Sequence, residues 1–121
     1  MSESQSLGQK GETFAIEYLQ KAGYKIRHRN WRSGKKELDI VAENNDYIVF
    51  VEVKTRTDDY LENPVNAITR EKQRSIIFAA DGYIRRYDLN KESRFDVITV
   101  IAKGETLDID HIENAFYPTL R

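Results

Sequence analysis

Apolar and polar positions alternate along the first half of this chain with two different periods, which predict where its helices and strands lie. Over residues 7–22, small and apolar side chains recur every three or four positions, as in an amphipathic helix, and Gly23 follows as a stop signal. Residues 24–31 are predicted to be extended and to end near Ser33-Gly34. Residues 36–43 and 46–55 are predicted to be two strands joined by a tight turn at Asn44-Asn45.

The second half of the chain continues with another helix and two more strands. Asn63-Pro64 has the form of a helix cap followed by proline at the first helical position, and it predicts a long helix to about Tyr87. Runs of apolar residues predict strands over 94–103 and 106–115, with a turn between them. This order of elements predicts an α/β fold in which a mixed sheet is flanked by helices.

Length and composition limit the classes of protein to which the chain can belong. With 121 residues, of which 40% are hydrophobic, it fits a single domain over 7–121 behind a flexible polar N-terminus of residues 1–6. It has no cysteine, which excludes disulfides and cysteine-ligated zinc. No apolar run is long enough to cross a membrane, and the polar N-terminus lacks the apolar stretch of a signal peptide, so we expect a cytoplasmic protein.

Positive charge is concentrated in one segment although the formal net charge is only −1. Seven of the twelve residues from Lys25 to Lys36 are lysine, arginine or histidine, next to Tyr24 and Trp31. Such a patch could hold the phosphates of a nucleic acid, and the alternative is a solvated strand and loop. The candidate nucleic-acid-binding residues in this segment are Arg29, Arg32, Lys35 and Lys36.

Charge also interrupts a strand that is otherwise apolar on both faces, as expected for a central strand. Because side chains alternate along a strand, Glu52 and Lys54 point to the same side near its end. A two-residue turn at Asn44-Asn45 would place Glu37 opposite Glu52 and make Asp39 its diagonal neighbour. A shift of two residues would oppose Asp39 and Glu52 directly and keep the shared face, whereas a one-residue slip would lose it.

Two carboxylates this close repel each other unless a cation or a proton lies between them. Oxygen ligands suit Mg²⁺ or Mn²⁺, which Asp39, Glu52 and the backbone carbonyl of Val53 could hold, with Glu37 as a further candidate ligand. Such a metal can polarise a phosphate and generate hydroxide, while Lys54 orients water or offsets developing charge. The alternative is a surface hairpin with a Glu-Lys pair, in which Glu37 is an exposed charge at a strand end.

The two predicted helices contribute further candidates. Glu12 lies on the apolar-leaning side of the first helix, which favours a site residue over an ion pair within the helix. Lys72 lies in the middle of the apolar stripe of the second helix, where it could reach a substrate phosphate or merely extend its ammonium into water. Gln73 could assist it. Arg56, just after the Glu52 strand segment, could bind phosphate or be a solvated strand end.

Three other polar residues are predicted to lie outside the site. His28 and His111 are isolated in the sequence and are expected on the surface. Asp96 opens the strand over 94–103 and is expected to be structural, bonding a neighbouring backbone group.

Several short motifs together resemble those of the YraN-type family of bacterial proteins, and the resemblance covers nearly the whole chain. That family is similar to archaeal Holliday junction resolvases and belongs to the PD-(D/E)XK nuclease-like superfamily. Leu38 stands before Asp39 where the superfamily motif has proline. The matching segments are Gly8-Gln9-Lys10-Gly11-Glu12, residues 24–31, Glu37-Leu38-Asp39-Ile40-Val41-Ala42, residues 50–56, Lys72-Gln73 and Arg94-Phe95-Asp96-Val97.

The resemblance implies an α-β-β-β-α-β core of the restriction-endonuclease type, with two copies pairing across a sheet edge or helix. It implies a catalytic set of Glu12, Asp39, Glu52 and Lys54. The expected function is therefore Mg²⁺- or Mn²⁺-dependent hydrolysis of phosphodiester bonds in DNA, including branched or structured DNA. The alternative is a non-catalytic nucleic-acid-binding or DNA-processing interaction module on the same fold.

Overall fold

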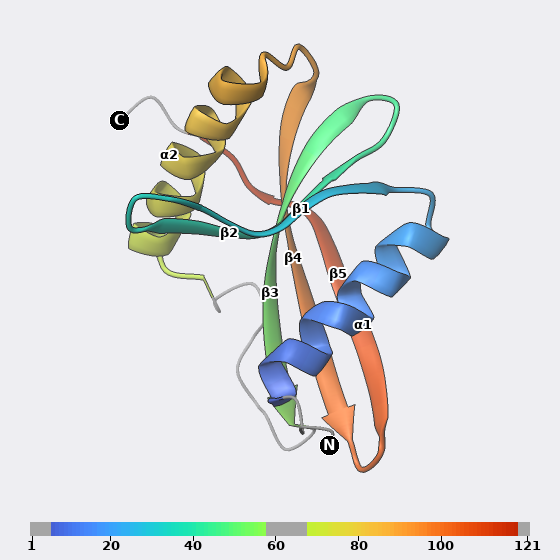
Figure 1. The fold of residues 1–121 in the computed structure, drawn as a ribbon. Helices are drawn as coiled ribbons and strands as arrows, with labels where there is room; N and C mark the ends of the chain where they lie inside the picture. The colour runs from blue at the N-terminus through green and yellow to red at the C-terminus, as the bar shows by residue number, and fades with distance from the viewer. Residues whose placement is uncertain (1–5, 58–67, 119–121) are drawn as a thin grey trace, which may run out of the picture.

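The computed structural model describes residues 6–57 and 68–118. Its elements follow the predicted order of helix, three strands, helix and two strands (Figure 1). In chain order they are α1 (Leu7–Lys21), β1 (Lys25–Ser33), β2 (Lys36–Glu43), β3 (Tyr47–Thr57), α2 (Arg70–Tyr87), β4 (Glu92–Lys103) and β5 (Thr106–Phe116).

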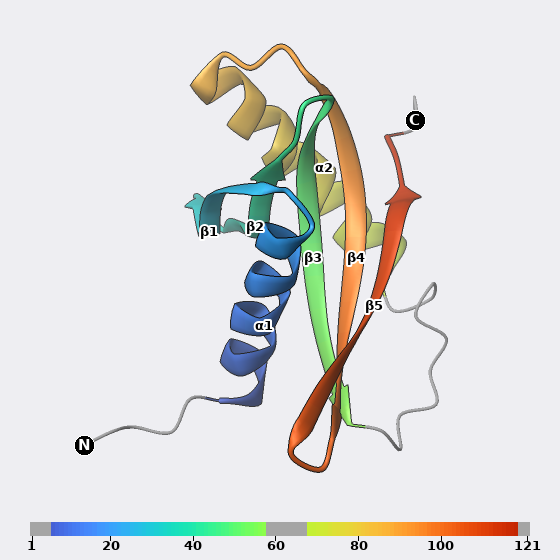
Figure 2. The same cartoon turned by 90° about the vertical axis from the view of Figure 1, so that its right-hand side faces the viewer.

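The five strands form one mixed sheet in the order β1-β2-β3-β4-β5. The neighbouring pairs are antiparallel except β3 and β4, which run parallel and are connected through α2. The two helices lie on opposite sides of the sheet (Figures 1 and 2). The predicted α/β fold with a mixed, helix-flanked sheet is therefore confirmed.

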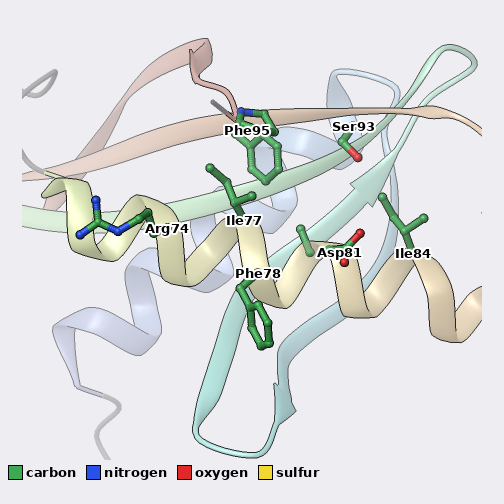
Figure 3. A pocket seen from close by; sticks show the side chains of 9 residues that line it. Arg74, Ile77, Phe78, Asp81, Ile84, Ser93 and Phe95 are labelled. Carbon is green, nitrogen blue, oxygen red and sulfur yellow. The ribbon is translucent and has the colours of Figure 1, made fainter. Parts of the chain in front are cut away.

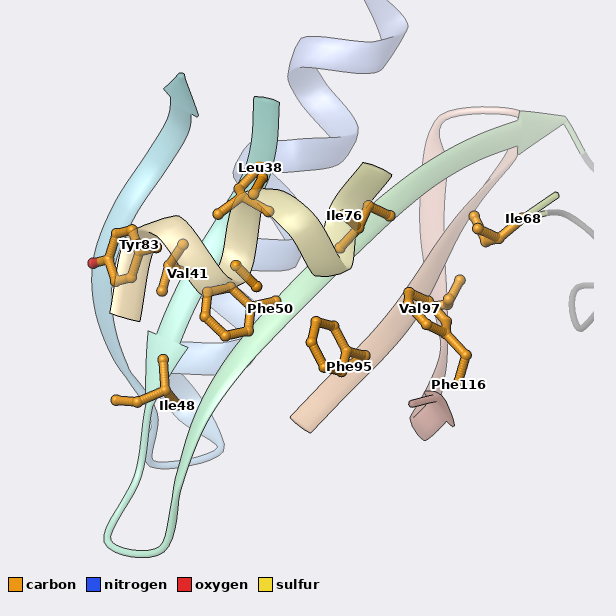
Figure 4. Close-up of a cluster of buried hydrophobic side chains, with 12 residues drawn as sticks. Leu38, Val41, Ile48, Phe50, Ile68, Ile76, Tyr83, Phe95, Val97 and Phe116 are labelled. Atoms are coloured by element: carbon orange, nitrogen blue, oxygen red, sulfur yellow. The ribbon is translucent and has the colours of Figure 1, made fainter. Parts of the chain in front are cut away.

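Each face of the sheet carries its own apolar core, and β3 contributes to both. Ile48 and Phe50 face α2 and pack with Ile76, Tyr83 and Phe95 (Figure 4). The alternate positions of β3, Val49 and Val51, pack on the other side with Ala15 and Leu19 of α1. Alternation along a strand buried on both faces explains why its apolar run is continuous.

The helices begin where side chains satisfy their free N–H groups. Ser6 and Gln9 form a reciprocal capping box at the start of α1. The Thr69 side chain accepts a hydrogen bond from the backbone N–H of Lys72, so α2 begins at Arg70. The predicted cap at Asn63-Pro64 lies outside the described residues. The prediction of one continuous helix from there to about Tyr87 is wrong, because the backbone of Thr69 is extended. No helix among the described segments is long and apolar enough to span a membrane.

The turn between β2 and β3 differs from the prediction by one residue. The backbone N–H of Asn44 bonds to the carbonyl of Tyr47, so the turn residues are Asn45 and Asp46. The Asn44 side chain fixes this turn by accepting hydrogen bonds from the backbone N–H groups of Asp46 and Tyr47. The pairing continues to Ile40 opposite Val51. The predicted opposition of Glu37 and Glu52 is therefore wrong, and continuing this register by one residue places Asp39 opposite Glu52.

Strand β2 changes direction at Asp39. Leu38 and Ile40 would share a face in a regular strand, yet Leu38 packs in the α2-side core and Ile40 in the α1-side core. The neighbouring strand is irregular at the same place, where Asn30 has a φ of 53°. This bend brings the end of the β1–β2 hairpin toward α2 (Figure 1).

Candidate metal and catalytic site

Asp39 and Glu52 meet where β2 bends and β3 leaves the core. The Oδ2 atom of Asp39 accepts a hydrogen bond of 2.9 Å from the backbone N–H of Val53, which fixes its carboxyl against β3. Glu52 is only 6% exposed, on the α2 side of the sheet. The two carboxyls lie close enough together that the charge of Asp39 raises the pKa of Glu52. The structure thus brings together the pair that strand parity predicted.

The surroundings of this pair favour its protonated form. Burial raises the pKa of Glu52 to about 7, and the neighbouring Asp39 adds to the effect, while Lys72 and Lys54 oppose it. Burial also raises the pKa of Asp39, against the lowering effect of the Val53 N–H. The proton belongs to the pair rather than to either group. A cation of higher charge could replace it and relieve the same repulsion.

Two lysines from different elements approach the pair. The Nζ atom of Lys54, two residues along β3, lies 4.0 Å from Oε2 of Glu52. The Nζ atom of Lys72, in the first turn of α2, lies 3.8 Å from the same oxygen. The Lys54 side chain is 25% exposed and that of Lys72 is 47% exposed, so both ammonium groups also face solvent. Both ammonium groups could therefore contact a bound anion while staying close to the Glu52 carboxyl.

Helix α1 places Glu12 on the other side of the same strand end. A Cβ atom on Gly11 would lie 2.2 Å from Oγ1 of Thr55, so only glycine lets the helix approach β3 this closely. Glu12 is held by Asn30 at 3.2 Å and by Arg29 at 3.5 Å. Burial and the charge of Asp39 raise its pKa. Glu12 is therefore near enough to influence Asp39 electrostatically, but its own bonds are to β1.

The donor set fits magnesium or manganese only with part of the coordination supplied from outside the side chains. Within 6–57 and 68–118, no three carboxylate or histidine side chains cluster closely enough to hold a metal ion. Asp39 and Glu52 provide two hard oxygen ligands, and Mg²⁺ is commonly bound by one or two carboxylates together with waters and substrate phosphate. Glu37 forms an exposed ion pair of 3.8 Å with Arg32. Its proposed ligand role remains a prediction, as does that of the Val53 carbonyl.

Two open clefts flank the carboxylate pair. One of about 610 Å³ lies toward α1 and is lined by Glu12, Glu37, Lys54 and Arg56 among others. Another of about 760 Å³ lies toward α2 and is lined by Lys36, Lys72 and five further residues. Lys54 lines the first cleft and Lys72 the second, so the two lysines link the carboxylate pair to both clefts.

The predicted basic patch is divided between these surroundings. Arg29 bonds to Thr13 and to the backbone of α1, whereas Arg32 is 72% exposed at the hairpin. Lys35 is exposed in the β1–β2 turn, and Lys36 faces α2. The Gln73 side chain donates to the backbone carbonyl of Ile68, so in this structure it ties down the start of α2. Arg56 bonds to the carbonyl of Thr55.

A second polar cluster, buried on the α1 side of the sheet, was not predicted. Asp96 is fully buried, accepts hydrogen bonds from Arg94 and pairs with Nε2 of His111 at 2.8 Å. Nδ1 of His111 in turn contacts the Tyr18 hydroxyl at 2.8 Å. The expected surface position of His111 is therefore wrong, because its two ring nitrogens are held by Asp96 and Tyr18. The structural role of Asp96 is confirmed, since it also accepts from the backbone N–H of Asn114.

His28 also differs from its expected surface position. Its ring is partly buried, and Nδ1 lies 2.7 Å from the hydroxyl of Tyr83, which Arg27 also contacts. An aromatic contact to Tyr87 completes the arrangement. The one sequence signal for these buried polar contacts was a charged residue, Asp96, inside an apolar strand. No local pattern pointed to either histidine.

Comparison with known proteins gives a consistent family match. Residues 11–100 match the model described as "Uncharacterised protein family UPF0102". A UPF0102 protein of Bacteroides fragilis is 48% identical over 120 residues, covering 99% of both chains. One of Phocaeicola vulgatus is 46% identical with the same coverage. One of Nitratidesulfovibrio vulgaris is 44% identical and covers 90% of this chain and 82% of its own.

Proposed function

The chain belongs to the UPF0102 family, and from that premise we propose that it is a metal-dependent nuclease that hydrolyses phosphodiester bonds in DNA. The observation that carries the proposal is the pair formed by half-buried Asp39 and buried Glu52, which Lys54 and Lys72 approach from two elements. A soluble protein rarely buries two neighbouring carboxylates unless they share a proton or a metal. Burial and the charge of Asp39 raise the pKa of Glu52, and a divalent cation bound between the two carboxylates would relieve both effects at neutral pH.

Each residue has a role that follows from its position. Asp39 and Glu52 would hold Mg²⁺ or Mn²⁺, and the bound metal would supply Lewis-acid activation of the phosphate and of water. Lys54 is close enough to the pair to orient a water molecule or to stabilise negative charge on the phosphate. Lys72 would bind a phosphate oxygen from the α2 side. Glu12, from the opposite cleft, would accept a proton or bind a water, since its pKa is raised.

The alternative is a non-catalytic nucleic-acid-binding module on the same fold. The absence of a third ligating side chain beside Asp39 and Glu52, among the residues that the structure describes, favours it. The two functions differ in what they require of the carboxylates. Catalysis needs both carboxylates ionised around a metal, whereas phosphate binding needs only the lysine and arginine side chains.

The test is cleavage of labelled linear, single-stranded, flapped and four-way DNA with Mn²⁺ or Mg²⁺. We expect Asp39→Asn and Glu52→Gln to abolish cleavage, because each removes a charged metal ligand. Lys54→Ala should reduce cleavage at least as strongly as loss of one transition-state donor, about 100-fold or more. Asp108→Asn is a matched control, since Asp108 is an exposed carboxylate paired with Lys103 on the β4–β5 hairpin.

Metal binding should be measured on the same proteins. Saturating Mn²⁺ should raise the melting temperature of the wild-type protein and of Asp108→Asn, but not of Asp39→Asn. Cleavage that persists in Lys54→Ala and Glu52→Gln would indicate a contaminating enzyme. Binding of DNA with neither a metal-dependent melting shift nor cleavage would favour the non-catalytic module.

A further inference from the structure

An aromatic ring on α2 is left exposed close to the candidate site. Phe78 is 67% exposed, more than any other large apolar side chain in the described ranges. It lies outside the stripe of α2 that packs on the sheet, which contains Ile76, Ala79 and Tyr83. Figure 3 shows its ring pointing away from Ile77 and Phe95. The ring therefore contributes little to the core and is available to bind.

The surface next to this ring is a polar groove rich in cations. Among the described residues that line the cleft of about 760 Å³ on the α2 side, Phe78 is the one aromatic residue. The Nζ atom of Lys36, from the start of β2, lies 5.6 Å from the centre of the ring. At its other end the groove reaches Lys72 and, through it, Glu52. The remaining lining residues are Thr69, Glu71, Arg74 and Ser75.

Beyond the ring lies a cavity of different character. It has a volume of about 490 Å³, and its walls are mainly apolar, including Ile77, Ile84 and Phe95 (Figure 3). Phe78 and Arg74 line both this apolar cavity and the polar groove. The ring thus separates a surface suited to phosphates from one suited to a flat apolar group. A nucleotide carries both kinds of group.

We propose that this groove binds single-stranded nucleic acid, with the phosphates on Lys36, Lys72 and Arg74 and an unpaired base stacked on Phe78. A ring can stack on a base only if the face of that base is free, which a continuous duplex does not offer. This proposal rests on the proposed function only for its consequence for cleavage, since the binding itself needs no metal.

The geometry relates the stacked base to the bond that would be cut. Phe78 lies six positions after Lys72, or about 9 Å along the helix axis. Along the axis of a duplex, the phosphates of one strand follow one another at about 3.4 Å, and they are further apart in an extended strand. The stacked base therefore belongs within a few nucleotides of the phosphate at Lys72. Substrates with an unpaired nucleotide beside the scissile bond should be preferred to continuous duplex.

Binding without metal tests the proposal separately from catalysis. Fluorescence anisotropy in EDTA would compare a labelled oligothymidylate with a blunt duplex of equal length. We expect Phe78→Ala and Phe78→Leu to weaken single-strand binding about five- to tenfold, the lower range for loss of one stacked base, and to leave duplex binding unchanged. Phe78→Trp should retain binding, and oligothymidylate should quench its fluorescence beyond the signal change of wild-type Trp31.

Tyr117→Ala is the matched control, because Tyr117 is 63% exposed and lines a different cleft. Its single-strand affinity should equal that of the wild type. The proposal is overturned if Phe78→Ala binds oligothymidylate as tightly as wild type, if Phe78→Leu retains full affinity, or if the wild-type protein binds neither oligonucleotide. Loss of binding in Phe78→Ala together with no cleavage by wild type would uphold this proposal and reject the nuclease function.

Discussion

Replacing Glu52 with glutamine should stabilise the metal-free protein at high pH and not at low pH. Below about pH 4.5 the Glu52 carboxyl is protonated in both the folded and the unfolded state, so the uncharged glutamine changes little. Because the folded-state pKa is raised to about 7, the folded protein retains this proton over a range in which the unfolded chain has released it. The stabilisation from that proton is lost as the pH rises through about 7.

The size of the effect follows from the two pKa values. A rise from 4.5 to about 7 corresponds to about 3 kcal/mol of unfolding free energy, lost by the wild type between acid and about pH 8. Part of this belongs to Asp39, whose own pKa should fall when its charged neighbour is removed. Since whole domains are stable by about 5–15 kcal/mol, a difference of this size is readily measured.

Urea denaturation of both proteins in EDTA, followed by circular dichroism from about pH 4.5 to about pH 8, measures the difference directly. We expect the free energy of unfolding of Glu52→Gln to exceed that of wild type by about 3 kcal/mol at the alkaline end and to match it at the acid end. Asp108→Asn should follow the wild type at every pH. A Glu52→Gln difference that is constant with pH, or of opposite sign at about pH 8, would refute the assigned burial and repulsion.

Two further predictions concern parts of the fold that support the site. Gly11→Ala should lower stability by about 1–3 kcal/mol, because its Cβ would lie 2.2 Å from Oγ1 of Thr55. Gly8→Ala is the matched control: its Cβ would meet only Ser6 Oγ at 3.9 Å, so this variant should be neutral or stabilising by up to about 1 kcal/mol. Thermal melts of the two variants decide this, and equal melting temperatures would contradict the close approach of α1 to β3. Asp96→Asn should lower stability by about 3–5 kcal/mol, because it removes the buried charged partner of Arg94 and leaves only the exposed Glu113 at 3.8 Å. Urea denaturation beside Asp108→Asn measures it, and similar small losses in the two variants would show that Arg94 is not dependent on Asp96.

The sequence predicted the elements well because their signals are local. The alternation around Glu52 and Lys54 placed both side chains on one face, and the distance of 4.0 Å between Lys54 Nζ and Glu52 Oε2 agrees with that. The direct pairing of Asp39 with Glu52 was only the alternative register, because Asn44-Asn45 and Asn45-Asp46 are both suitable turn sequences. The side chain of Asn44 decides between them through two hydrogen bonds that no periodicity reveals.

Contacts between distant segments could not be predicted in the same way. Tyr18 and His111 are 93 positions apart and meet only after α1 packs on the sheet and β5 pairs with β4. The exposed ring of Phe78 had a weak signal, since it falls outside the apolar stripe of its helix. Its relation to Lys36 depends on the bend in β2, which an ideal strand model excludes.

The parallel pairing of β3 with β4 has a consequence for the order of folding. Strands β1, β2 and β3 are consecutive and antiparallel, so they can associate through short turns, whereas β4 joins only after the longer connection through α2 has closed. Asp39 and Glu52 both belong to the early group, while Lys72 arrives with α2. When β1, β2 and β3 associate, Asp39 and Glu52 should therefore repel each other before Lys72 is in place. Refolding should accelerate when the solution is acidified or supplied with a divalent ion, because either change reduces that repulsion.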